Sequence, residues 1–164
     1  MAIKEHTLED LFLETLKDIY SAEKIILKAL PKMAKAANSN ELRQAFERHR
    51  DETEAQVERL EQVFGLMERP ARAKTCEALQ GIVEEAKEVM DEFKGSDVLD
   101  AGLLSSAQAV EHYEISRYGT LKSWAGQLGM SEAVKLLDTT LQEEKKTDQI
   151  LTELAESAVN RKAA

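Results

Sequence analysis

The sequence is poor in the residues that interrupt or cross-link a chain. Its 164 residues include two prolines, seven glycines and one cysteine, and aromatic residues make up 5%. The single cysteine, Cys76, excludes an intrachain disulfide framework and fits a reducing compartment. No run of about 18 or more apolar residues occurs, so we expect neither a membrane-spanning helix nor a membrane partner. The opening segment MAIKEHTLED lacks the apolar stretch of a secretory signal, and we therefore expect a cytoplasmic protein.

Positive charge is also scarce. Lys and Arg total 22 against 31 Asp and Glu, which gives a formal net charge of −9. Binding of nucleic acid needs a basic surface that neutralises phosphates, so this composition predicts no nucleic-acid partner. The short basic run RPARAK at 69–74 is too small to change that expectation and is interpreted as a solvated loop.

Apolar residues at helical spacing are abundant. Their i, i+3, i+4, i+7 pattern predicts an all-α protein, and no strand-like alternation holds for long. We expect one domain over residues 1–164, with helices at about 8–37, 41–64, 71–94, 98–128 and 132–159. Thr7 with Asp10 is a capping pair for the first helix, and Ser131 is predicted to cap the last. Gly65 is predicted to end the second helix in a left-handed conformation.

The lengths of the connections predict how these helices are arranged. The connections at 38–40 and 129–131 are short, so each should join two antiparallel neighbours. The connection at 66–97 is long and carries a helix of its own. This order predicts a ferritin-like antiparallel four-helix bundle with a crossover. A weak repeat at an offset of 91 positions, which relates Glu23 to Glu114, agrees with two similar hairpins or with an ancient duplication.

Polar residues interrupt the apolar stripes near the middle of the four long helices. The candidates are Glu23, His49, Glu52, Glu111, Glu114 and Glu144. Carboxylates this close together need protons or a cation, because leaving water uncompensated costs each of them several kcal/mol. Two divalent ions would balance four or five carboxylates, and oxygen ligands with one imidazole suit iron, with manganese as the alternative. Two other interpretations stay open, in which the glutamates lie at solvated edges and His49 is a hydrogen-bonded core residue.

Residues beside these six leave further alternatives. Glu143 is one position from Glu144, so either of them is a candidate ligand. Gln56 and Asp148 are candidates for hydrogen bonds to the ligands, which metal sites generally require. Tyr118 is interpreted either as a group that bonds a ligand or takes part in oxidation, or as an ordinary core tyrosine.

Four segments of the chain resemble one family. DIYSAEK (18–24), HRDETEAQVERLE (49–61), VEHYEISRYGTL (110–121) and LQEEKKTD (141–148) are similar to the YciF/YciE-like family of bacterial ferritin-like stress proteins. The resemblance covers essentially the whole chain. It implies a four-helix bundle with a crossover helix, a homodimer, a role in stress responses and a two-metal carboxylate site at the six residues given above. It does not supply a reaction.

One feature departs from the wider ferritin-like pattern and keeps several functions open. The second helix reads His49-x-x-Glu52 instead of Glu-x-x-His, and Thr147 stands where the last helix would carry a histidine. The first function we consider is a di-iron protein that reacts with oxygen or peroxide. The second is a structural or binding homodimer in which metal only stabilises the bundle, without turnover. The third is iron storage in a shell, for which we find no specifying feature.

Overall fold

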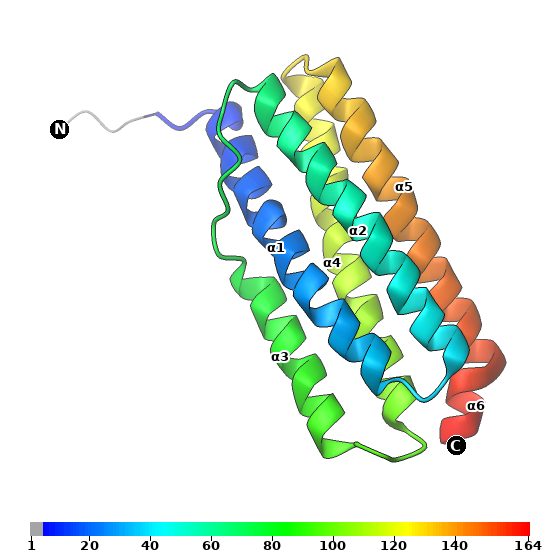
Figure 1. The fold of residues 1–164 in the computed structure, drawn as a ribbon. Coiled ribbons are helices and arrows are strands. Elements are labelled where there is room, and N and C mark those ends of the chain that lie inside the picture. The colour runs from blue at the N-terminus through cyan, green and yellow to red at the C-terminus, as the bar shows by residue number, and fades with distance from the viewer. Residues whose placement is uncertain (1–4) are drawn as a thin grey trace.

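The computed structural model describes residues 5–164 and is all-α. The long helices lie side by side, and a shorter helix lies on the outside of them (Figure 1). The long helices are α1 (Leu8–Ala36), α2 (Asn40–Leu66), α4 (Leu99–Gln127) and α5 (Ser131–Leu154), and the shorter one is α3 (Glu77–Glu92). The chain ends in a π-helical turn, Ala155–Val159, and in α6 (Asn160–Ala163). The predicted fold class is confirmed.

The helices form two antiparallel hairpins that pack face to face. α1 pairs with α2 and α4 pairs with α5, while α1 also contacts α4 and α2 contacts α5. Because α2 and α4 run in the same direction, the chain must return along the whole bundle between them (Figure 1). The return segment includes α3, which lies against α1 and α4. This is the predicted bundle with a crossover helix, and it brings the midpoints of the four long helices to a similar height.

The helix ends follow the sequence signals only in part. The Thr7–Asp10 capping box at α1 is present as predicted, with the Asp10 amide donating to Thr7 Oγ1 at 3.1 Å. The prediction for Gly65 is wrong, because α2 continues through Gly65 to Leu66 and the left-handed residue is Glu68, with φ 54°. The prediction for Ser131 is also wrong, since it is the first helical residue and makes no side-chain cap.

The crossover helix begins later than expected, at Glu77 instead of about residue 71. The residues just before α3 donate backbone hydrogen bonds to α1 instead of extending the helix. The amide of Lys74 donates to the carbonyl of Lys17 at 3.1 Å, and the amide of Cys76 donates to Ser21 Oγ at 3.2 Å. These contacts fix the segment in an extended course, which local composition alone does not reveal.

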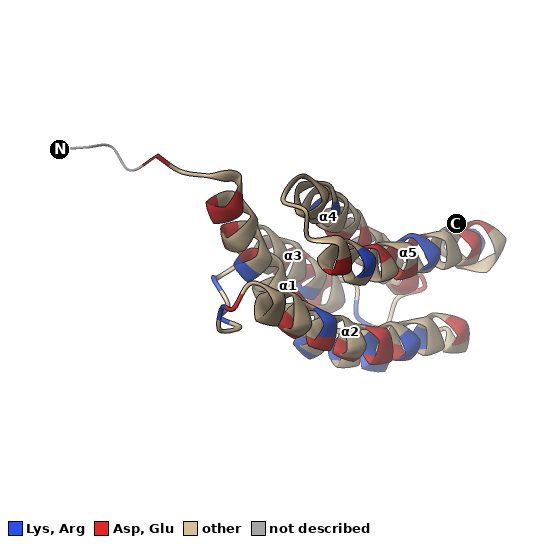
Figure 2. Cartoon of the chain, turned by 90° about the horizontal axis from the view of Figure 1, so that it is seen from above, with Lys and Arg blue, Asp and Glu red and all other residues tan. Residues whose placement is uncertain are grey.

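Close packing holds α3 against α4 at one position. A Cβ atom on Gly102 would lie 2.5 Å from Cγ1 of Val89, so only glycine lets the two helices approach this closely. In the described part of the chain no helix is long and apolar enough to cross a membrane. Figure 2 shows acidic and basic residues interspersed along α2 and α5.

Asp100 holds the turn between α1 and α2 from the start of α4. It is 5% exposed, and its two carboxylate oxygens accept the amides of Asn38 and Ser39, each at 2.7 Å. We expect Asp100→Ala to lower the free energy of unfolding by about 2–3 kcal/mol, because two partly buried amides lose a charged acceptor. Urea denaturation checks this, with Asp97→Ala as the control on an exposed neighbour. Equal stability of the two variants would contradict the role given to Asp100.

Candidate metal centre

The six predicted ligands lie on the inward faces of the four long helices. Glu23 is on α1, His49 and Glu52 are on α2, Glu111 and Glu114 are on α4, and Glu144 is on α5. The helical period puts each of them in register with the apolar residues of its own helix, so packing of the apolar faces carries the polar groups inward. Four of the glutamates are 0% exposed and His49 is 3% exposed, whereas Glu52 is half-buried.

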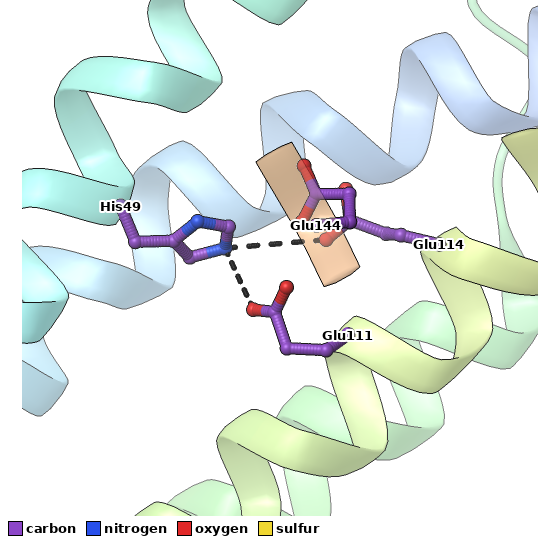
Figure 3. A group of neighbouring side chains, drawn as sticks. All are labelled: His49, Glu111, Glu114 and Glu144. Carbon is purple, nitrogen blue, oxygen red and sulfur yellow. Dashed lines mark ion pairs between the residues drawn. The ribbon is translucent and has the colours of Figure 1, made fainter. Parts of the chain in front are cut away.

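Four of these residues converge on one point (Figure 3). Each of His49, Glu111, Glu114 and Glu144 offers one nitrogen or oxygen atom, and these atoms all lie within 4.8 Å of one another. His49 Nε2 is 2.9 Å from Glu111 Oε1 and 4.0 Å from Glu114 Oε2. The shorter distance lacks the alignment of a hydrogen bond, so both atoms remain without a hydrogen-bond partner. Both atoms face a shared space.

The glutamates in this cluster have pKa values above the ordinary range of a carboxyl group. Burial raises the pKa of Glu111 to about 8, with the charges of Glu23, Asp148 and Glu52 adding to the effect. Burial, followed by the charge of Glu144, likewise raises the pKa of Glu23 to about 8. The pKa values of Glu114 and Glu144 are raised well above the usual range, first by burial and then by neighbouring carboxylates. Such a group of acids carries its full negative charge only when a cation compensates it.

Tyr118 connects Glu23 to the cluster. Its hydroxyl donates to Glu23 Oε1, while Glu23 Oε2 is buried without a partner. Tyr118 is itself fully buried, and its pKa is raised well above the usual range by burial and then by the charges of Glu23 and Glu114. The tyrosine therefore remains a neutral hydrogen-bond donor that orients one oxygen of Glu23 and leaves the other free to face the interior.

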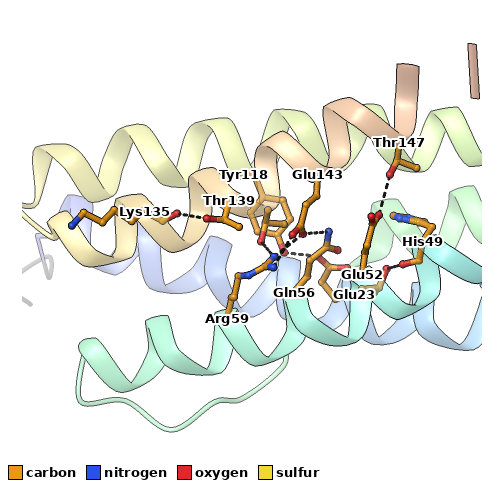
Figure 4. Close-up of polar contacts among 12 residues, drawn as sticks. Glu23, His49, Glu52, Gln56, Arg59, Tyr118, Lys135, Thr139, Glu143 and Thr147 are labelled. Carbon is orange, nitrogen blue, oxygen red and sulfur yellow. Dashed lines mark hydrogen bonds and ion pairs between the residues drawn. The ribbon is translucent and has the colours of Figure 1, made fainter. Parts of the chain in front are cut away.

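Glu52 lies at the edge of the cluster. It is not among the four residues that converge, and its Oε2 accepts a hydrogen bond from the Thr147 hydroxyl at 3.3 Å (Figure 4). Thr147 thus stands at the position on α5 where the wider ferritin-like pattern would place a histidine ligand. The His49–Glu52 pair is still on one face of α2, so a rotation of the Glu52 side chain would bring it toward the same space.

The structure separates the two adjacent glutamates of α5. Arg59 forms a two-pronged ion pair with Glu143, with distances of 2.6 and 2.7 Å, and Gln56 donates to the same carboxylate at 3.1 Å (Figure 4). Glu144 makes no hydrogen bond through either oxygen. The geometry therefore favours Glu144 as the candidate ligand and gives Glu143 a structural pairing. Sequence reasoning overlooked Arg59, although it follows His49, Glu52 and Gln56 at helical spacing.

The donor set fits a metal ion better than it fits an ordinary polar core. A solvated edge does not describe glutamates that are 0% exposed, and both ring nitrogens of His49 lack a hydrogen-bond partner. Buried polar atoms are normally paired, because an unpaired one costs about 1–3 kcal/mol or more if it is charged. Ligands at about 2.1 Å on opposite sides of one ion stand about 4.2 Å apart, which is close to the spread of the cluster atoms.

Known proteins of similar sequence have the same fold as this chain. Residues 7–164 match the model of a domain of unknown function, DUF892. Protein YciF of Escherichia coli (strain K12) is 48% identical over 161 residues, which cover 96% of this chain and 95% of that protein. The crystal structure of the E. coli stress protein YciF matches with a TM-score of 0.91 and 46% identity, over 96% of this chain and 99% of that one.

Two further solved structures are similar. YcfI of Rhodopseudomonas palustris, described as a candidate structural protein, has a TM-score of 0.88 and 45% identity over 93% of this chain and 97% of its own. A protein from Xanthomonas campestris pv. campestris has a TM-score of 0.72 and 21% identity over 94% of each chain, which shows a shared fold only. On the match over residues 7–164 and the 48% identity to YciF, the chain belongs to the DUF892 family of YciF-like stress proteins.

Proposed function

We propose that this chain is a di-metal carboxylate protein of the bacterial stress response, with two iron ions, or alternatively manganese, bound inside the bundle. The observation that carries the proposal is the set of buried donor atoms on α2, α4 and α5 that converge without hydrogen-bond partners, with the unpartnered Oε2 of Glu23 on α1 near Glu114 and Glu144. The ligands are Glu23, His49, Glu111, Glu114 and Glu144, with Glu52 completing the set from the edge. Five carboxylates and two divalent ions nearly cancel in charge.

The residues around the cluster support such a centre in distinct ways. A pair of ferrous ions held there would supply two electrons to an oxidant such as oxygen or peroxide. Tyr118 holds Glu23 in place through its hydroxyl, and Arg59 with Gln56 keeps Glu143 turned away from the cluster. The surrounding core excludes bulk water, which strengthens each electrostatic contact with a bound cation.

Metal content tests this proposal. We expect protein made in iron-replete cells to retain about two iron or manganese ions per chain after gel filtration, by elemental mass spectrometry. Glu114→Gln should lose most of this metal, because it removes a charged ligand from the centre of the cluster. The matched control is Glu143→Gln, which changes a glutamate already paired with Arg59 and should keep the wild-type content. Equal metal content in both variants, or none in the wild type after anaerobic loading with ferrous iron, would contradict the proposal.

A second function is favoured by one feature of the cluster. His49 is its only imidazole among the described residues that converge, and efficient oxygen activation in ferritin-like proteins typically uses more histidine. In this alternative the chain is a structural or binding homodimer that metal stabilises without turnover. Mixing the anaerobic, ferrous-loaded protein with oxygen separates the two, because only the first function predicts rapid oxidation of the bound iron. Sedimentation of the same sample tests the expected homodimer.

A further inference from the structure

A narrow apolar space reaches the cluster from one side of the bundle. It is enclosed between α1, α3 and α4, and about 20 Å³ of it is free to the centre of a water-sized sphere. His49 and Glu111 bound its inner end. The rest of its wall is apolar except for Ser106, whose hydroxyl already donates to the carbonyl of Gly102 at 3.0 Å. A cavity of this size has room for about one small molecule.

A wider groove of about 150 Å³ lies outside this cavity, between α1 and α3. The two spaces share the wall residues Ala29, Met33, Val83 and Ala86, which therefore lie between them. Met33 is unbranched and changes rotamer readily, and such movements occur on the nanosecond scale or slower in a packed wall. Movement of these side chains would join the groove to the cavity, and the two spaces would then form a passage from the surface to the candidate metal centre.

The chemistry of the passage selects among the molecules that a metal centre would use. Exposed Lys28, Lys32 and Lys87 line the groove, and Lys87 is paired with Glu84 at 3.4 Å. The positive charges of Lys28 and Lys32 repel divalent cations. The wall further in is apolar apart from the Ser106 hydroxyl, so hydrogen peroxide would lose most of the hydrogen bonds that it makes with water, and a polar oxidant is disfavoured. Dioxygen is neutral, apolar and diatomic, which matches both the lining and the size of the inner cavity.

We infer that this passage is the route by which dioxygen reaches the His49 and Glu111 side of the cluster, and that dioxygen is the oxidant. The inference rests on the proposed function and deepens it, since that function leaves oxygen and peroxide open. Ala29 and Val83 stand on opposite walls, α1 and α3, at the junction of cavity and groove. Metal ions must then reach the cluster from another side of the bundle.

The test measures dioxygen itself inside the metal-free protein. Dissolved oxygen is paramagnetic and speeds the relaxation of nearby methyl groups in NMR spectra. We expect this enhancement to be several-fold larger at the methyls of Ile26 and Val110, which line the cavity, than at those of Leu60 and Leu137, which are buried elsewhere in the core. Equal enhancement at the two pairs would overturn the inference.

Substitutions at the junction complete the test. Ala29→Phe should lower the enhancement at Ile26 and Val110 to the level of the reference methyls and leave metal content unchanged. Ala55→Phe, at a half-buried alanine that lines neither space, is the matched control and should change neither quantity. Val83→Phe blocks the opposite wall and gives the same test if Ala29→Phe fails to fold. Enhancement that persists in both blocking variants would overturn the route. Metal content of the wild type decides the proposed function separately.

Discussion

Replacing Glu114 by leucine should make the metal-free protein more stable and abolish its response to metal. Glu114 is 0% exposed, and neither of its oxygens has a hydrogen-bond partner. Its pKa is raised well above the usual range by burial and then by the charges of Glu144, Glu23 and Glu111. Leucine has a similar volume and carries no polar group, so it removes both the desolvation cost and the repulsion.

The expected gain is about 1–4 kcal/mol in the free energy of unfolding, as when well-packed apolar residues replace buried ionic groups. For a chain of this length each kcal/mol corresponds to about 2–4 °C in Tm. At saturating metal the wild type should instead be more stable than the Glu114→Leu variant. At a free concentration of about 1,000 times Kd, binding adds about 4 kcal/mol to the wild type and little to the variant.

Glu143 on α5 provides a control, because its substitution should change the stability of the metal-free protein in the opposite direction. Glu143→Leu breaks the ion pair with Arg59 and should destabilise the metal-free protein, while the metal response remains. Calorimetry in chelator and in excess ferrous or manganous ion measures all three proteins. A metal-free Glu114→Leu variant that melts below the wild type, or that gains as much from metal, would contradict the account. Glutamates kept at a cost to stability point to a functional site.

The metal-free protein should lose stability as the pH rises from about 5 to 8. Glu23 and Glu111 have pKa values of about 8 in the folded chain, against an ordinary glutamate pKa of 4.5 in the unfolded chain. Between these values the folded state binds more protons than the unfolded state, so the free energy of unfolding falls as protons become scarce. The contribution of these two groups is fully present below about 4.5 and is lost by about 8. Its total is on the order of several kcal/mol.

Metal should reverse this dependence on pH. Ions compete with protons for the same oxygens, so binding tightens and releases protons as the pH rises. Urea denaturation at several values between pH 5 and pH 8, in chelator and in excess metal, measures both slopes. The Glu114→Leu variant should show a flatter slope in chelator, because it removes one of the coupled acids. A wild-type stability in chelator that is constant or rises over this range would show that the glutamates are already ionised and compensated by other groups.

Helical spacing was sufficient to predict the fold because it repeats along every long helix. Thr7 with Asp10 fixed the start of α1, and two short connections fixed the antiparallel pairs. The start of α3 could not be read in the same way. Residues 71–76 are compatible with a helix by composition, but the amides of Lys74 and Cys76 bond to α1, and such partners depend on the tertiary structure.

The candidate site was likewise predictable from helical spacing only in part. The angular position of Glu23, Glu111, Glu114 and Glu144 on their helices predicted their burial, and the structure places all four in the core. The choice between Glu143 and Glu144 depends on Arg59, which belongs to a different helix. Glu52 was predicted with the others, but it lies half-buried against Thr147 because its position is one turn on, toward the edge of the apolar stripe.

A cluster of three polar side chains outside the candidate metal centre was not predicted from the sequence. The hydroxyl of Tyr113 donates to Asp18 Oδ2 at 2.5 Å, and the thiol of Cys76 lies 3.1 Å from the same hydroxyl. The three residues are far apart in the sequence and belong to α4, α1 and the residue before α3. This group anchors the crossover to the hairpins, and no local spacing indicates it.

We propose that the buried carboxylate cluster holds two metal ions. Anomalous diffraction at the iron absorption edge, from crystals grown anaerobically with ferrous iron, tests it most directly. We expect two peaks about 3.5–4 Å apart, enclosed by Glu23, His49, Glu111, Glu114 and Glu144. An iron-soaked crystal with no peak inside this cluster, and with its glutamates placed as they are here, would contradict the account.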